Sequence, residues 1–253
     1  MLRKTVFYLV ILQFLGIQLA CAIPTHVLVR VKAKDAKFIG TSMGGALVTI
    51  KDAYTGELLT KGFTSGGTGD THLIMKTPKT RGMTIGKGAA RFDGIIDIDE
   101  PKLIEISVKA PYAQRQAMQE MTLTTWVIPG RDIAGDGIVF EMPGFVVDVL
   151  SPPAHTMKKG SGNMIRLVAS VSPMCGCPVN PNTFWHPESI EVGAFVKRNG
   201  KFIDEIPLKF SGKTNIFVAD LLLKEPGAYT ISVFAFDRKS GNTGVDMTTI
   251  VIH

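Results

Sequence analysis

The chain has 253 residues, of which 45% are hydrophobic and 20% charged, and its formal net charge is +6. This length favours two domains, and the composition excludes intrinsic disorder, collagen and coiled coils. Only one stretch is apolar enough to enter a bilayer, and it lies at the N-terminus, so a membrane protein with several spans is excluded.

Residues 1–22 have the pattern of a cleavable secretory signal peptide. Arg3 and Lys4 precede an apolar run at 6–19, and small residues follow at 20–22. We expect cleavage after Ala22 and a periplasmic or cell-surface location. An uncleaved anchor and lipid attachment at Cys21 are the alternatives. Cleavage leaves 26 cations against 22 anions, a net charge of +4, without a basic run that would indicate nucleic-acid binding.

Residues 23–143 predict a first β-sandwich, because short alternating segments follow one another with Gly, Asn, Asp and Pro at the joints. No long segment with helical periodicity interrupts them. The expected strands are 26–33, 46–52, 58–63, 71–76, 90–98, 103–109, 121–128 and 137–142.

A hairpin is expected at residues 45–58. The segment alternates up to Asp52, and Thr55-Gly56 provides a tight turn before the return strand. It resembles the first hairpin of carboxypeptidase regulatory-like, transthyretin-like domains. The glycine-rich segment 64–70 departs from that family's pattern and predicts an irregular second hairpin. The resemblance implies a non-catalytic accessory module, of a kind that sometimes contacts glycans or partner proteins.

Residues 144–253 predict a second sandwich of the immunoglobulin-like type. Tyr229 follows Pro226-Gly227 and resembles a tyrosine corner, and Asn199-Gly200 indicates a two-residue hairpin turn. No linker separates the domains at 142–144, so we expect them to be coupled. The seven expected strands are 145–150, 164–172, 189–197, 202–210, 215–223, 228–237 and 245–252.

The long connection 173–187 contains the two cysteines that remain after cleavage, Cys175 and Cys177. Three interpretations are open: a disulfide, a Cu(I) or Zn(II) site, or a thiol–disulfide exchange pair. The metal site would use both cysteines with His186 and Met174, or with Asp237, water or a partner as the fourth ligand.

Side-chain alternation places aromatic residues outside the second sandwich. If Tyr229 points into the core, Phe234 and Phe236 point outward, and Phe195 on the neighbouring strand does the same. We expect these three residues to form a face that packs on the first domain or on a partner.

The sequence contains no nucleophile elbow and no phosphate loop in a strand-to-helix context. The leading hypothesis is therefore an all-β, exported, non-catalytic accessory protein of the bacterial envelope that binds a protein partner. The second is a periplasmic protein that binds Cu(I) or Zn(II). The third is glycan binding through the first domain, which predicts a shallow groove with Trp126 or Tyr112 exposed.

Overall fold

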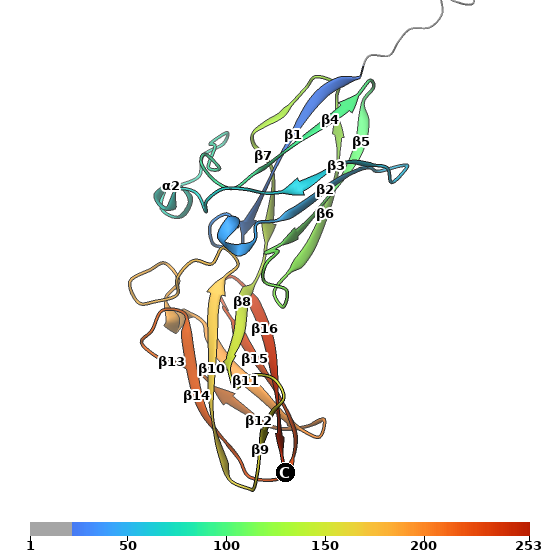
Figure 1. The fold of residues 1–253 in the computed structure, drawn as a ribbon. Coiled ribbons are helices and arrows are strands. Elements are labelled where there is room, and N and C mark those ends of the chain that lie inside the picture. The colour runs from blue at the N-terminus through green and yellow to red at the C-terminus, as the bar shows by residue number, and fades with distance from the viewer. Residues whose placement is uncertain (1–21) are drawn as a thin grey trace, which may run out of the picture.

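A computed structural model describes residues 22–253, and it confirms the predicted all-β class. Two β-sandwiches follow one another along the chain and lie end to end, with the C-terminus at the far end of the second (Figure 1). The predicted leader and Cys21 lie outside the described residues. Within 22–253 no helix combines the length and the apolar composition needed to cross a bilayer.

The first sandwich contains two sheets, of strand order β4-β1-β7 and β3-β2-β5-β6. Strand β1 is central in the smaller sheet, antiparallel to β4 and parallel to β7. A 3-10 turn, η1 (Thr41–Met43), follows β1. The strands are β1 (Ile23–Ala33), β2 (Leu47–Asp52), β3 (Leu58–Phe63), β4 (Phe92–Ile98), β5 (Lys102–Ala110), β6 (Gln119–Val127) and β7 (Ile133–Met142).

The expected hairpin at 45–58 forms between β2 and β3. The Asp52 carboxylate accepts hydrogen bonds from the backbone N–H groups of Tyr54 (2.8 Å) and Thr55 (2.9 Å), and Gly56 has a φ of +75°. Lys102 Nζ lies 2.8 Å from the same carboxylate. The hydrogen bond from Lys102, followed by those from the turn, lowers the pKa of Asp52 far below its usual value.

The strand predicted at 71–76 is wrong, because this segment forms a short helix, α2 (Thr71–Met75). The Asp70 side chain caps the helix by accepting a hydrogen bond from Leu73 N at 2.7 Å. Ile74 is buried in a small satellite cluster with Phe38 and Ala89. Local capping and one buried contact therefore outweigh the β-like pattern of a segment that has no strand beside it.

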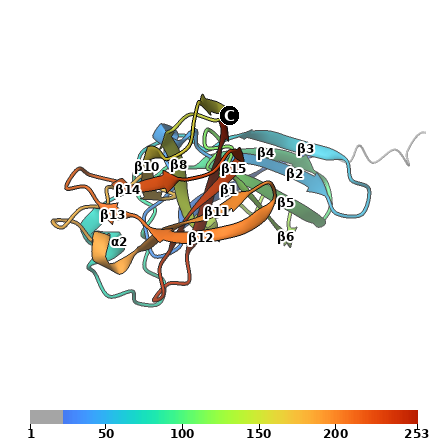
Figure 2. The same ribbon diagram turned by 90° about the horizontal axis from the view of Figure 1, so that it is seen from below.

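The second sandwich contains sheets of order β13-β14-β10-β8 and β12-β11-β15-β16-β9. Viewed from below, β12 lies next to β11 at the edge of its sheet (Figure 2). The strands are β8 (Phe145–Ser151), β9 (Thr156–Lys158), β10 (Asn163–Pro173), β11 (Glu191–Arg198), β12 (Lys201–Pro207), β13 (Lys209–Phe210), β14 (Ile216–Leu223), β15 (Gly227–Phe236) and β16 (Thr243–Ile252).

Two features of this domain differ from the expected seven strands. The single strand predicted at 202–210 is divided into β12 and β13, which belong to different sheets. Pro207 ends β12, and Leu208, only 5% exposed, enters the core where the chain changes sheets. Strand β9 was not predicted, since it is a three-residue segment that pairs in parallel with β16.

The two local motifs expected in the second domain are both present. Tyr229 is 2% exposed, and its hydroxyl donates a hydrogen bond to the backbone oxygen of Glu225 at 2.6 Å, as in a tyrosine corner. Asn199 and Gly200 have φ angles of +49° and +80° and connect β11 to β12. Ile231, two residues after Tyr229, is fully buried in the core of this domain, so apolar packing joins the two sheets at this point.

Candidate functional site

The domain junction is built by the connection between β10 and β11. Its residues Met174, Cys175 and Cys177, together with Val146 of β8, belong to the buried cluster that forms the core of the first domain. Met43 of η1 belongs to the same cluster. The hydrophobic core of the first sandwich is therefore completed by residues of the second half of the chain.

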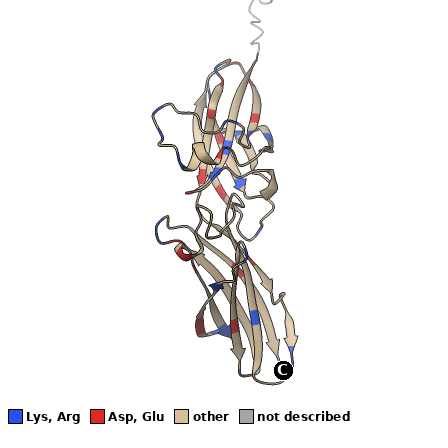
Figure 3. Cartoon of the chain, turned by 90° about the vertical axis from the view of Figure 1, so that its left-hand side faces the viewer, with Lys and Arg blue, Asp and Glu red and all other residues tan. Residues whose placement is uncertain are grey.

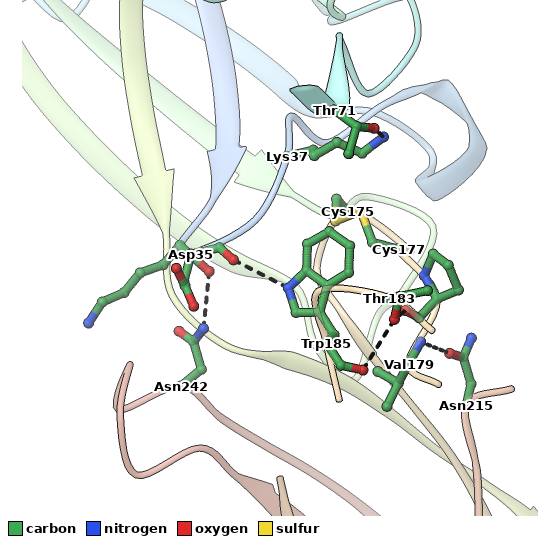
Figure 4. Close-up of a disulfide and its surroundings, with 12 residues drawn as sticks. Asp35, Lys37, Thr71, Cys175, Cys177, Val179, Thr183, Trp185, Asn215 and Asn242 are labelled. Carbon is green, nitrogen blue, oxygen red and sulfur yellow. Dashed lines mark hydrogen bonds between the residues drawn. A yellow bond between two sulfur atoms is a disulfide. The ribbon is translucent and has the colours of Figure 1, made fainter. Parts of the chain in front are cut away.

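Cys175 and Cys177 are joined by a disulfide, and they are 1% and 3% exposed (Figure 4). Gly176 between them has a φ of +69°. A Cβ atom at this glycine would lie 2.5 Å from Met43 Sδ. Glycine is required here both by the left-handed backbone and by the close approach of the two domains.

Hydrogen bonds around the disulfide tie the same two domains together. The Trp185 indole donates from Nε1 to the backbone oxygen of Asp35 at 3.2 Å (Figure 4). Asn242 is 3% exposed; its Nδ2 donates to the Lys34 oxygen at 3.1 Å, and its Oδ1 accepts from Gly144 N at 2.9 Å. Nothing in the sequence singled out Asn242, because it reads as an ordinary turn residue between β15 and β16.

The structure brings Met174, Cys175 and Cys177 into one buried cluster, but His186, the fourth residue predicted to bind a metal, lies outside it. Met174 is 1% exposed, while the His186 side chain is 43% exposed and lies at the start of η2 (Pro187–Ser189), 3.9 Å from the Glu188 carboxylate. Within residues 22–253 no three His, Cys, Asp or Glu side chains are placed to hold an ion together. Because the sulfurs are bonded to one another, Cu(I) or Zn(II) binding stays a prediction for the reduced protein.

The aromatic face lies on the outer side of the five-stranded sheet. Phe195 of β11 and Phe234 of β15 stack with their ring centroids 5.0 Å apart, and Phe202 of β12 lies 6.4 Å from Phe195. A Cβ at Gly193 would lie 2.6 Å from Phe234 Cζ, so this glycine leaves room for the ring. Phe236 lies two residues along the same side of β15 and is half-buried.

Strand β16 extends this apolar surface. Val245 is paired with Phe234, and Met247 is paired with Ser232, and the two side chains are 51% and 62% exposed. Phe195 and Phe202 are 39% and 60% exposed. None of these residues takes part in the domain contacts described above. We define the aromatic face by Phe195, Phe202, Phe234, Val245 and Met247.

The outer side of the sheet β3-β2-β5-β6 in the first domain is shallowly hollowed and polar. The hollow, of about 370 Å³, is lined by lysine, glutamate, serine and threonine side chains, with Leu47 and Leu58 on β2 and β3. Within it Lys109 and Ser107 contact Glu120 at 3.3 and 3.0 Å. Trp126 of β6 is 56% exposed on the same side of that strand as Glu120, whereas Tyr112 is half-buried against Phe63.

No family model and no curated protein matches the sequence. The carboxypeptidase regulatory-like resemblance is therefore unconfirmed. Solved structures that are similar to this chain include an engineered protein (18% identity, 47% of this chain, 22% of that chain, TM-score 0.32). A second is the structure of fibronectin(III)-like modules of Clostridium thermocellum CbhA (19% identity, 42% of this chain, 93% of that chain, TM-score 0.27). A third is titin domains Z1Z2 in complex with telethonin (11% identity, 92% of this chain, 98% of that chain, TM-score 0.25). The chain thus spans about a fifth of the engineered protein. The sandwich fold itself is assigned from the strand orders and the two buried cores.

Proposed function

We propose that this protein is an exported, non-catalytic binding protein that docks a protein partner on the aromatic face. The observation that carries the proposal is the run of apolar side chains across β12, β11, β15 and β16, in which Phe234 is half-buried and the other four members are exposed. Stacked aromatic rings on a rigid sheet lose little conformational entropy on binding, and aromatic residues dominate the energetic centres of protein interfaces.

The surroundings of the aromatic face resemble the rim of an interface. Glu205 is paired with Phe195, and Lys197 is paired with both Phe202 and Thr230, so polar side chains border the rings. An apolar centre with a charged rim gives affinity through the centre and selects the partner through the rim. The partner that fits is a protein with a complementary apolar patch and both signs of charge around it.

Export is part of the same proposal. The leader predicts passage across the cytoplasmic membrane, and a disulfide between Cys175 and Cys177 suits an oxidising compartment such as the periplasm or the cell surface. In this interpretation the first, transthyretin-like domain is an accessory module that holds the second domain in place through the shared core at the junction.

Site-specific photo-crosslinking in the expressing cells tests the proposal. A photoreactive residue replaces Phe202 in one strain and Met164, which is 63% exposed on β10 in the other sheet, in a control strain. We expect a discrete crosslinked protein from position 202 that is absent from position 164 and is lost when Phe234→Asp is added. Equal crosslinking from both positions, or a product that is insensitive to Phe234→Asp in a folded variant, contradicts the proposal.

Glycan binding through the first domain is a second candidate, favoured by the hollow on the sheet β3-β2-β5-β6 and the exposed Trp126 beside it. An exposed indole stacks on sugar rings, and serine, threonine and lysine side chains hydrogen-bond hydroxyl groups. A glycan array probed with the mature protein tests this function. A hit must be lost in Trp126→Ala and kept in Tyr54→Ala, whose ring is 75% exposed at a turn of the same domain.

A further inference from the structure

A second hollow lies at the domain junction and is lined mainly by lysines. Its volume is about 460 Å³, within the range of pockets that hold small ligands. Both domains contribute to it, since the ends of β1 and β7 form one wall and the turn between β15 and β16 forms the other. The lining residues are Lys32, Lys34, Asp35, Lys79, Glu141, Lys239 and Ser240.

One lysine in this hollow is already neutralised. Lys32 Nζ lies 2.9 Å from Glu141 Oε1, and its side chain is only 8% exposed. Burial by itself would raise the pKa of Glu141, but the hydrogen bond from Lys32 and the charges of Lys32 and Lys79 outweigh it, so the pKa is lowered. Glu141 is thus an anion at neutral pH. Lys34, Lys79 and Lys239 line the same hollow, so the positive side chains there outnumber the two carboxylates of Glu141 and Asp35.

The backbone that carries Lys34 and Lys239 is held in place by hydrogen bonds. Lys34 N donates to the Met142 oxygen at 2.8 Å, and the Lys34 oxygen accepts from Asn242 Nδ2. On the opposite wall, Lys239 N donates to Asp237 Oδ1 at 2.9 Å and Ser240 Oγ donates to Asp237 Oδ2 at 2.6 Å. The two walls are therefore held at a set separation before any ligand arrives, which lowers the entropic cost of binding.

Elsewhere along the chain the charges are mixed. On the side shown in Figure 3, blue and red segments alternate over both sandwiches. The junction differs because lysines from three separate segments of the chain line one hollow. Four lysines against Asp35 and Glu141 give this hollow a net charge of +2. Ammonium groups that converge from several directions attract a ligand whose negative charges are close together.

We propose that this hollow binds a compact polyanion, a ligand that carries two or more carboxylate or phosphate groups within a few bonds of each other. Lys34, Lys79 and Lys239 pair with the anionic groups, while the Ser240 hydroxyl stays bonded to Asp237. Because the lysines come from both domains, the bound ligand also bridges them. The hollow and the aromatic face share no residue, so each proposal stands or fails by itself.

Isothermal titration of the mature protein tests the inference, with citrate, pyrophosphate and a hexaglutamate peptide as probes. Binding of citrate or pyrophosphate supports a compact polyanion, whereas binding of the peptide alone indicates an acidic segment of a polypeptide and contradicts the inference. The expected result is saturable one-to-one binding of citrate or pyrophosphate that weakens strongly between roughly 20 mM and about 300 mM NaCl, because salt screens exposed charges.

Paired variants locate the binding site. Lys34→Gln/Lys239→Gln removes two unneutralised lysines and is expected to weaken binding roughly tenfold. Lys159→Gln/Lys213→Gln makes the same change in net charge at exposed positions of the second domain that do not line the hollow, and is expected to change the affinity by less than about twofold. Equal weakening in both double variants, or no saturable binding of any probe, overturns the inference.

Discussion

Replacing Gly176 by alanine tests the close approach of the two domains. An L residue in the left-handed region costs about 1–2 kcal/mol. In addition, the new Cβ would lie 2.5 Å from Met43 Sδ, so the thioether must move by roughly 1 Å to restore normal contact. Met43 is only 8% exposed, which leaves little room, and such overpacking costs about 1–3 kcal/mol. The expected loss is therefore about 2–5 kcal/mol.

The matched control is Gly200→Ala. Gly200 has a similar φ of +80°, but a Cβ there meets no atom within 4 Å. This variant is expected to lose only the conformational cost of about 1–2 kcal/mol. The difference between the two variants isolates the contact with Met43, because the backbone penalty is common to both.

Urea unfolding, followed by tryptophan fluorescence and by far-UV circular dichroism, measures the free energy of unfolding. Because the core of the first domain includes residues of the second half of the chain, the two signals should change together in the wild-type protein. Met43→Ala should destabilise the Gly176→Ala variant by about 1 kcal/mol less than it destabilises the wild-type protein, because the smaller side chain relieves the clash. Equal losses in Gly176→Ala and Gly200→Ala, or strict additivity with Met43→Ala, refute the reasoning.

Further predictions concern Tyr229, Asp52 and the two cysteines. Tyr229→Phe should destabilise the protein by about 1 kcal/mol, because it removes the hydroxyl bonded to the Glu225 oxygen. Tyr54→Phe, at a ring 75% exposed, is the control and should be neutral in the same urea titration. Because the pKa of Asp52 is lower in the folded protein than in the unfolded chain, its ionised form stabilises the fold at any pH above the unfolded-state pKa of about 4. This contribution declines as the pH falls from about 4 toward the lower pKa of the folded state. The stability gap between wild type and Asp52→Asn should therefore be constant at neutral pH and shrink in acid; a gap that stays constant down to pH 2 contradicts this assignment. Thiol counting on the denatured mature protein should find no free thiol before reduction and two afterwards. Metal analysis of the reduced protein, with Cys175→Ser as control, then tests the Cu(I) or Zn(II) hypothesis, which requires stoichiometric metal that depends on the cysteine.

Much of the fold could be predicted because its signals are local. The strand of period two at β2, the Thr55-Gly56 turn and the Asn199-Gly200 turn depend only on side-chain alternation and on backbone angles that few residues adopt. The tyrosine corner is equally local, since Tyr229 and Glu225 are four residues apart. The stacking of Phe195 and Phe234 followed from the same alternation once the two strands were neighbours.

The failures arise where a helix cap, or contacts that the strand pattern does not show, decide the structure. At 71–76 the β-like pattern had no strand to pair with, so the Asp70 cap and the contact of Ile74 with Phe38 decided for a helix. At 202–210 the chain changes sheets at Leu208, a step that depends on which sheet has a free edge. Phe202 was missed as a member of the aromatic face because a register shift between β11 and β12 turns it toward Phe195.

The sequence alone determined that this chain forms sandwiches with apolar interiors, because alternation and turns are encoded within short windows. Only the tertiary structure decided what the cysteine connection does. It buries Cys175 and Cys177 in the core of the other domain, away from His186, and it brings Lys34 and Lys239 to one hollow. Such contacts join residues far apart in the chain, and their geometry depends on how two completed sandwiches pack, which no local pattern specifies.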